Sequence, residues 1–225
     1  MKLNKNQLKE IDELGYVIIP GCFSNKEVNN IRKAMTTVFN EKTEANIIEK
    51  SSGAVRTAMG LHLRSKIFDN LTRHPNFFEP ACQIRGHNLY IQQTKINVKA
   101  AFTGEVWQWH YDFATHFGED GVPKPLALNL HVFLDDVNEF NGSLFFIPKS
   151  HKYGSAPSKL DTVTTNYPLW VVDQQTVKTL VNENGIISAL GKAGTVLIFV
   201  DNLVHGSPHN MSPWDRAIFS VILNP

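Results

Sequence analysis

The period of the hydrophobic pattern changes once along the chain, at about residue 88, and this change limits the fold more than any other feature. Before it, apolar residues recur every three or four positions, as on a helix; after it, they alternate, as in strands. The alternating segments are 89–98, 127–134, 143–147, 195–200 and 216–223. Helices followed by such strands predict a mainly β chain, a helix-backed β-sandwich or jelly roll.

The first 87 residues are predicted to form a mostly helical support. Ser24 followed by Glu27 is a capping box, and the apolar residues after it keep a helical spacing. Residues 16–19 form a short apolar run that Pro20 and Gly21 stop, so they read as a strand. Residues 40–65 are polar and irregular and predict a loop.

Composition excludes several classes of protein. The chain has 22 basic and 21 acidic residues and a formal net charge of +1, so it lacks the basic excess typical of nucleic-acid binding. Two cysteines, Cys22 and Cys82, do not make a disulfide-dense secreted scaffold. The sequence shows no signal peptide and no apolar run that could span a bilayer. We therefore expect a cytoplasmic protein with no nucleic-acid or membrane partner.

A chain of 225 residues fits one large domain or two small ones. No internal repeat or low-complexity linker divides it, so we expect a single domain over 1–225, with residues 1–87 supporting a β core at 88–225. Residues 152–190 show little regular pattern before Thr176 and are expected to form an insertion between strands. Long loops of this kind are often functional lids.

Three residues carry a candidate metal site. His110 and Asp112 form an HxD pair, whose side chains point to the same side of an extended chain. His205 follows the apolar strand 195–200. Two histidines and one carboxylate form the facial triad that binds non-haem Fe(II) and leaves positions open. HxD alone is a weak signal, and a zinc hydrolase using the same three residues is an alternative.

Polar side chains on the predicted strands add a candidate pocket. Arg216 begins the last strand and offers a planar fork that can hold a carboxylate, such as the distal one of 2-oxoglutarate. On strand 89–98, one face carries Gln93, Lys95 and Asn97. Such a face is either a solvated edge or the lining of a polar cavity.

A further pair of polar residues interrupts an apolar strand. Asn129 and His131 share one face of segment 127–134. A buried amide or imidazole requires hydrogen-bond partners, so each is either a satisfied core residue or part of a polar pocket. For His131 we expect the core position.

The segment from Phe102 to Gly154 resembles the phytanoyl-CoA dioxygenase superfamily, and within it the ectoine hydroxylase branch. The shared motifs are FTG, WHxDF, EDGxP, VFLDD and NGxLxxIPxSH, followed by HGSxxNxSPxxR from His205 to Arg216. The N-terminal GYVIIPGCFS is also similar to the start of this superfamily. The resemblance covers most of residues 88–225. It implies a double-stranded β-helix that uses Fe(II), 2-oxoglutarate and O2 to hydroxylate an unactivated C–H bond.

The resemblance also implies roles for single residues. His110, Asp112 and His205 fall on the metal ligands and are the expected catalytic residues. The positions expected to contact 2-oxoglutarate are Asn97, Asn129, Ser207 and Arg216. Gln93 matches a substrate-contacting glutamine of the ectoine branch.

Two positions near the expected substrate depart from the ectoine branch. Lys95 stands where that branch has arginine, and His116 replaces an aromatic residue. Together with Gln93 and Trp107, these residues suit a small polar molecule, and we expect a free amino acid or an amino-acid-derived metabolite. The alternatives are an acyl-CoA substrate, for which no basic cluster is evident, and a non-catalytic 2-oxoglutarate-binding sensor. A monomer or a homodimer is expected.

Overall fold

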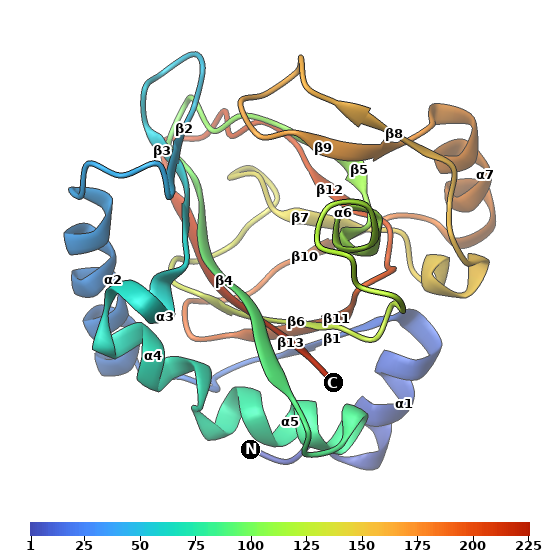
Figure 1. Ribbon diagram of the computed structural model, residues 1–225, viewed down its shortest axis with the longest axis horizontal. Helices are drawn as coiled ribbons and strands as arrows, with labels where there is room; N and C mark the ends of the chain where they lie inside the picture. Colours follow the sequence, from blue (N-terminus) through green and yellow to red (C-terminus); the bar gives the residue numbers. More distant parts are fainter.

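The structure, a computed structural model, describes residues 1–225 and consists of two antiparallel sheets (Figure 1). The seven-stranded sheet has the order β1-β11-β6-β13-β4-β3-β2, and the six-stranded sheet has the order β10-β7-β12-β5-β9-β8. Every strand pair is antiparallel. The predicted helix-backed jelly roll, a double-stranded β-helix, is confirmed.

The strands of the seven-stranded sheet come from both halves of the chain. They are β1 (Tyr16–Ile19), β2 (Asn46–Ile48), β3 (Val55–Met59), β4 (Tyr90–Lys99), β6 (Leu128–Phe133), β11 (Val196–Val200) and β13 (Arg216–Asn224). Those of the six-stranded sheet are β5 (Trp107–His110), β7 (Leu144–Phe146), β8 (Ser158–Asp161), β9 (Leu169–Val172), β10 (Ile187–Ala189) and β12 (His205–Ser207).

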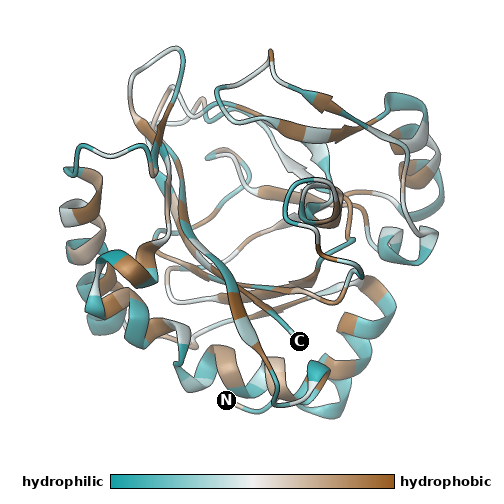
Figure 2. Ribbon diagram, viewed as in Figure 1, coloured by the Kyte–Doolittle hydropathy of each residue, from teal (hydrophilic) through white to brown (hydrophobic).

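The helices lie outside the seven-stranded sheet, except for α6 and α7. They are α1 (Lys5–Leu14), α2 (Asn25–Phe39), α3 (Leu61–Arg64), α4 (Lys66–Thr72), α5 (Pro75–Arg85), α6 (Asp112–Gly118) and α7 (Gln174–Asn184), with a 3-10 turn η1 (Ser150–Tyr153). In Figure 1, α1–α5 follow the outside of the seven-stranded sheet, and α7 packs on the six-stranded one. Figure 2 shows that these helices carry both polar and apolar residues along their length, as amphipathic helices do. No helix is long and apolar enough to cross a membrane.

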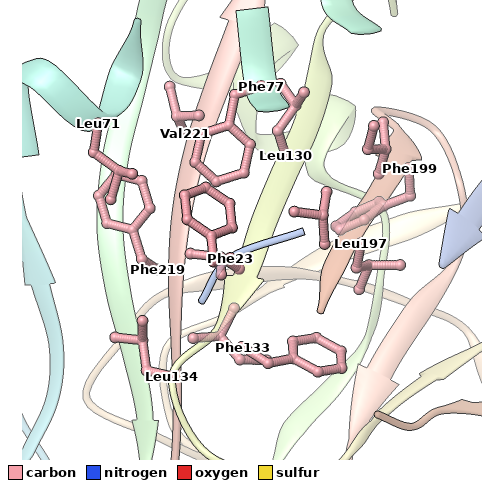
Figure 3. Packing of buried hydrophobic residues seen from close by; sticks show 14 of the residues in the cluster. Phe23, Leu71, Phe77, Leu130, Phe133, Leu134, Leu197, Phe199, Phe219 and Val221 are labelled. Atoms are coloured by element: carbon pink, nitrogen blue, oxygen red, sulfur yellow. The ribbon is translucent and has the colours of Figure 1, made fainter. Parts of the chain in front are cut away.

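The central strand β13 shows why the cavity side of this sheet differs from its helix side. All nine of its residues are buried, because both faces of the strand are covered. Phe219 points to the helix side and stacks on Phe68 and Phe77, with ring centroids 5.6 and 6.1 Å apart. Figure 3 shows Phe219 and Phe77 among the buried apolar side chains of this core. Arg216 and Ile218 are two residues apart, so they share the other face of the strand, and both side chains point into the molecule. The alternation of β13 therefore separates an aromatic core from a polar cavity.

One cluster of 36 buried apolar residues includes members from the helices and from both sheets. We propose that residues 1–225 form one domain, because this shared core leaves no boundary between the helical and the β part.

The predicted loop at 40–65 is wrong in part, because β2, β3 and α3 lie within it. The sequence concealed these strands because most of their buried positions are polar. Asn46, Arg56 and Thr57 are buried, and Arg56 is paired with Glu105. A hydrophobic alternation is therefore missing.

The segment 152–190 is also more regular than predicted. It contributes β8, β9 and β10 to the six-stranded sheet, together with α7. Strand β8 is an edge strand of four half-buried or exposed residues, which gives it no apolar signal. Instead of an irregular insertion, this segment supplies both edges of the six-stranded sheet, with β8 and β9 at one edge and β10 at the other.

Candidate active site

A cavity lies between the two sheets, and side chains from both sheets line it. From the seven-stranded sheet these are Gln93, Lys95, Asn97, Asn129, His131, Phe199, Arg216 and Ile218. From the six-stranded sheet and its loops they are Trp107, His110, Asp112, Thr115, His116, Leu144, Tyr167, Leu169 and His205. The polar face predicted for strand 89–98 is therefore the lining of a cavity and not a solvated edge.

The predicted metal ligands meet at this cavity. His110 and His205 face each other across the β5–β12 pair, with ring centroids 4.1 Å apart. The Oδ1 atom of Asp112 lies 3.7 Å from Nε2 of His110 and 4.0 Å from Nε2 of His205. One ligand atom from each residue lies within 4.8 Å of the others. This spacing suits three ligands on one face of a metal ion.

The HxD pair spans the end of a strand and the start of a helix. β5 ends at His110, and α6 begins at Asp112. Tyr111 between them is extended, with φ −132° and ψ 138°, so the two side chains still emerge on one side as predicted.

Hydrogen bonds orient both imidazoles for metal binding. Nδ1 of His110 donates to the carbonyl of Gln108 at 2.6 Å, and Nδ1 of His205 donates to that of Leu203 at 2.9 Å. The proton is therefore on Nδ1, which leaves the Nε2 lone pairs toward the cavity. Burial lowers the pKa of His110 to about 3, with His205 adding to the effect, and burial also lowers the pKa of His205. Both rings are neutral at pH 7, which is the form that binds metals.

Arg216 is a buried cation with no carboxylate partner in the protein. Its Nε and Nη2 atoms donate to the carbonyl of Gly142 at 3.1 and 2.6 Å. Burial lowers the pKa of the guanidinium to about 9, and Arg56 adds to this effect. A buried charge is costly until it is paired, so this end of the cavity is built for an anion.

A second buried cation, Lys99, lies opposite Arg216 in the β4–β13 register. Its Nζ donates to the carbonyls of Glu105 and Pro208. Burial lowers the pKa of Lys99 well below its usual value, and the charges of Arg216 and Arg56 add to this effect. Sequence analysis missed Lys99, although it continues the alternation of Gln93, Lys95 and Asn97.

Comparison with known proteins agrees with this geometry. The family model described as phytanoyl-CoA dioxygenase (PhyH) matches residues 11–218. The chain belongs to the phytanoyl-CoA dioxygenase family. An ectoine dioxygenase of Bordetella bronchiseptica is 33% identical over 99% of this chain and 75% of the relative. An L-proline trans-4-hydroxylase of Streptomyces griseoviridis is 30% identical over 93% of this chain and 82% of the relative.

Solved structures of this family share the fold. The structure of EctD from S. alaskensis with 2-oxoglutarate and 5-hydroxyectoine has a TM-score of 0.87 at 30% identity, over 99% of this chain and 76% of that one. The same protein with bound Fe has a TM-score of 0.86 at 29% identity, over 99% and 76% of the two chains. The predicted family resemblance is confirmed.

Strand register divides the polar residues of this family member between the two ends of the cavity. Arg216 lies at one end, and Asn97, in the next row, accepts a hydrogen bond from Thr57 at 2.8 Å. Asn129 lies opposite Ile222, in the same row as Gln93. Ile222 is six positions after Arg216 on β13. At about 3.4 Å per residue, the row of Asn129 and Gln93 is therefore about 20 Å from Arg216 along the strand. Asn129 is thus grouped with Gln93 and not with Arg216.

His131 is not the satisfied core residue that we expected. It lines the cavity, and neither ring nitrogen has a hydrogen-bond partner within the protein. Asn129 likewise has no partner for either side-chain atom, and Oε1 of Gln93 has none. Buried polar atoms of this kind require a ligand or water. The periodicity showed that these residues share a face, but not that the face borders a cavity.

Trp107 forms an aromatic wall on the Arg216 side. The guanidinium of Arg56 stacks 3.9 Å from the ring centroid of Trp107, and Tyr167 packs edge-on at 5.2 Å. Sequence analysis missed Tyr167 because it lies in a segment read as an insertion. Ser207 is opposite Trp107 in the β5–β12 pair; its buried Oγ has no protein partner, and it is not among the cavity-lining residues.

His116 also lines the cavity, on α6 beyond Asp112. It lies within the helix and is buried, so it is not an exposed loop residue. Its Nδ1 lies 2.8 Å from Oδ1 of Asp201, which is completely buried. Asp201 was not predicted from the sequence. Its only signal is its position directly after the apolar strand 195–200.

Proposed function

We propose that this chain is an Fe(II)- and 2-oxoglutarate-dependent dioxygenase that hydroxylates an unactivated C–H bond of a small polar metabolite. The observation that carries the proposal is the convergence of two neutral imidazoles and one carboxylate beside a buried, unpaired arginine. Membership of a family that includes an ectoine dioxygenase and an L-proline hydroxylase supports the same activity.

The residues present fit an Fe(II) ion. His110 and His205 offer Nε2 lone pairs fixed by their backbone hydrogen bonds, and Asp112 offers a carboxylate. Three ligands on one face leave positions for a chelating cosubstrate and for O2. When bound, iron and 2-oxoglutarate activate O2, giving succinate, carbon dioxide and a hydroxylated substrate. The protein contributes orientation of the reactants and exclusion of water.

We assign the end of the cavity at Arg216 to 2-oxoglutarate. The fork of Arg216 would hold the distal carboxylate. Asn97 is close enough along β4 to contribute, and the unpartnered hydroxyl of Ser207 is a further candidate. The register separates Asn129 from this group, so we assign it to the opposite end of the cavity.

The substrate belongs at the end that holds Gln93, Lys95, Asn129 and His116. These side chains offer an ammonium group, two amides and an imidazole, which match the donors and acceptors of an amino acid. We propose a free amino acid or an amino-acid-derived compound as the substrate. The L-proline and ectoine named for two relatives are compounds of this class.

Three rival functions are testable. An acyl-CoA substrate requires a grip on its phosphates, but Lys95 and Arg216 are the only lysine and arginine that line the cavity, and Arg216 is buried. A sensor that binds 2-oxoglutarate without turnover would keep the triad but release no succinate. A zinc hydrolase would remain active without O2.

We further propose that the protein acts in the cytoplasm as a monomer or a homodimer. Its two cysteines, Cys22 and Cys82, are free thiols, as expected in a reducing compartment. Size-exclusion chromatography with light scattering would determine the oligomeric state, and a stable tetramer would contradict the proposal.

The direct test incubates the Fe(II)-loaded protein with 2-oxoglutarate, O2 and a library of amino acids and their derivatives. Succinate formation coupled to a gain of one oxygen atom in one library member is expected. Coupled turnover of acyl-CoA alone would assign the rival substrate. Binding of 2-oxoglutarate without any succinate would identify a sensor.

A further inference from the structure

The pair formed by His116 and Asp201 has no role in binding iron or 2-oxoglutarate as assigned above. The two side chains are 4% and 0% exposed, and their facing atoms are 2.8 Å apart. They come from different elements, His116 from α6 and Asp201 from the residue after β11. A buried ion pair is a costly feature to maintain, so its position in the cavity wall calls for a function.

The backbone holds both partners rigidly in place. The backbone amide of Asp201 donates to the carbonyl of Ala127 at 3.2 Å, and the carbonyl of Asp201 accepts from the amide of Phe113 at 3.0 Å. The second bond ties the first turn of α6 to the end of β11. His116 is therefore presented to the cavity by a helix that begins at the metal ligand Asp112.

The pair lies at the substrate end of the cavity. Asp201 directly follows Val200, which pairs with Leu128, and the neighbouring residue Phe199 pairs with Asn129. This is the row that also contains Gln93. The buried amide of Asn129 and Oε1 of Gln93 have no protein partner, which independently indicates a polar ligand at this end.

We propose that Asp201 is a positioning residue that holds Nδ1–H of His116, so that Nε2 of His116 donates a hydrogen bond to an anionic oxygen of the primary substrate. The proposal rests on the proposed function, since it names a contact of that same substrate. It makes the pair a determinant of substrate affinity, separate from the site for 2-oxoglutarate.

The charged groups around the pair support a donor at Nε2. Burial by itself would lower the pKa of His116, but the carboxylate of Asp201, 2.8 Å from Nδ1, raises it, helped by the charge of Asp112. The positive charge of Lys95 lowers the pKa of His116. Burial raises the pKa of Asp201, and Asp112 adds to this effect, whereas His116 and His205 lower it. Arg85 is a further basic neighbour of Asp201. A protonated His116 would share with Lys95 the task of attracting an anion.

The first measurement reads the ring of His116 directly. Nitrogen-15 NMR of the histidine side chains is recorded on the full chain loaded with Zn(II) and 2-oxoglutarate, and the His116→Gln variant assigns the signals. In the wild type we expect Nδ1 to carry a proton and the ring to titrate above the ordinary value of about 6.5. In Asp201→Asn the titration should move down, whereas Asp12→Asn, an exposed control, should leave it unchanged.

The second measurement tests the contact with substrate. L-proline, ectoine and the other common L-amino acids are added as probes while the Nε2 resonance of His116 is followed. For the probe that the Fe(II) enzyme turns over, we compare the concentrations of probe and of 2-oxoglutarate that give half-maximal rates. In Asp201→Asn and His116→Gln the probe requirement should rise on the order of 10–100-fold, and the 2-oxoglutarate requirement much less.

The outcomes separate this proposal from the proposed function. An unchanged titration in Asp201→Asn, no shift of Nε2 by any probe, or equal rises in both requirements would overturn the positioning role. If Asp201→Asn fails to fold, His116→Gln still tests the substrate contact, and an unchanged probe requirement would overturn it. A wild type that forms no succinate but whose Nε2 responds to a probe would refute the dioxygenase and leave the contact intact.

Discussion

Arg216→Ala should abolish most of the affinity for 2-oxoglutarate while leaving the free protein at least as stable as the wild type. Arg216 is 1% exposed, and the only hydrogen bonds of its guanidinium go to the carbonyl of Gly142. Its pKa falls from 12.5 to about 9 on burial. Because arginine keeps its proton in proteins, the direction of this shift indicates that burying the charge is costly, by several kcal/mol.

A carboxylate bound by the fork would offset that cost. Hydrogen bonds to charged groups contribute about 1.5–3 kcal/mol each, and part of this is already supplied by Gly142. We therefore expect the concentration of 2-oxoglutarate for half-maximal rate to rise on the order of 10–1000-fold in Arg216→Ala, or about 1.4–4 kcal/mol. Loss of the bonds to Gly142 should be compensated by removal of the unpaired charge, so the unliganded variant should not melt earlier.

Thermal melting of the metal-loaded protein provides the assay. At a ligand concentration of about 100 Kd, 2-oxoglutarate should stabilise the wild type by about 2.7 kcal/mol, or about 5–11 °C for a chain of this size. A hundredfold weaker variant should gain only about 0.4 kcal/mol, or about 1–2 °C. Arg73→Ala, which removes a surface arginine paired with Asp69, is the matched control. An Arg216→Ala protein that retains the wild-type shift and the wild-type requirement for 2-oxoglutarate would refute the reasoning.

Three further predictions concern the stability of the fold. Phe219→Ala removes a fully buried ring that stacks on two others, and calorimetry should show a loss of about 3–5 kcal/mol; a loss below 1 kcal/mol would contradict the packing. Ser24→Ala removes the capping box of α2 and should lower the melting temperature by about 2–4 °C. Ser24→Asp, which keeps an N-cap acceptor, should retain most of the wild-type stability. Because the pKa of His116 is raised on folding, its pair with Asp201 stabilises the fold most below about pH 6.5 and loses this contribution as pH rises through the folded pKa. The difference in melting temperature between wild type and His116→Gln should therefore narrow with rising pH, and a constant difference would show that His116 does not titrate.

Much of the fold could be predicted because one chemical pattern dominates each part of the chain. In the strands of the β core, apolar residues alternate with others along the sequence. The start of the helix after Ser24 is marked by its capping box. Strands β2 and β3 were not predicted because Asn46, Arg56 and Thr57 occupy buried positions in them, and sequence patterns assign such residues to loops. Burial of paired polar groups leaves no hydrophobic period to detect.

The same reasoning explains which site residues were found. His110, Asp112, His205 and Arg216 stand in motifs, so spacing along the chain was sufficient to group them. Asp201 and Lys99 lie behind the cavity-lining residues His116 and Arg216, which are distant from them in sequence, and only the folded structure brings each pair together. For His131, the face of the strand was predicted, but the decision between core and cavity depended on the second sheet.

The most direct test of the account is oxygen-dependent succinate formation by the wild type and by His205→Ala. With Fe(II), 2-oxoglutarate and a substrate from the amino-acid library, the wild type should form one succinate for each O2 consumed, and neither anaerobic protein nor protein loaded with Zn(II) should form any. His205→Ala, which removes one of the three atoms that converge on the metal, should lose both iron and turnover. Near wild-type turnover in His205→Ala, or activity that persists without O2, would contradict the assignment of this cavity as an Fe(II)- and 2-oxoglutarate-dependent active site.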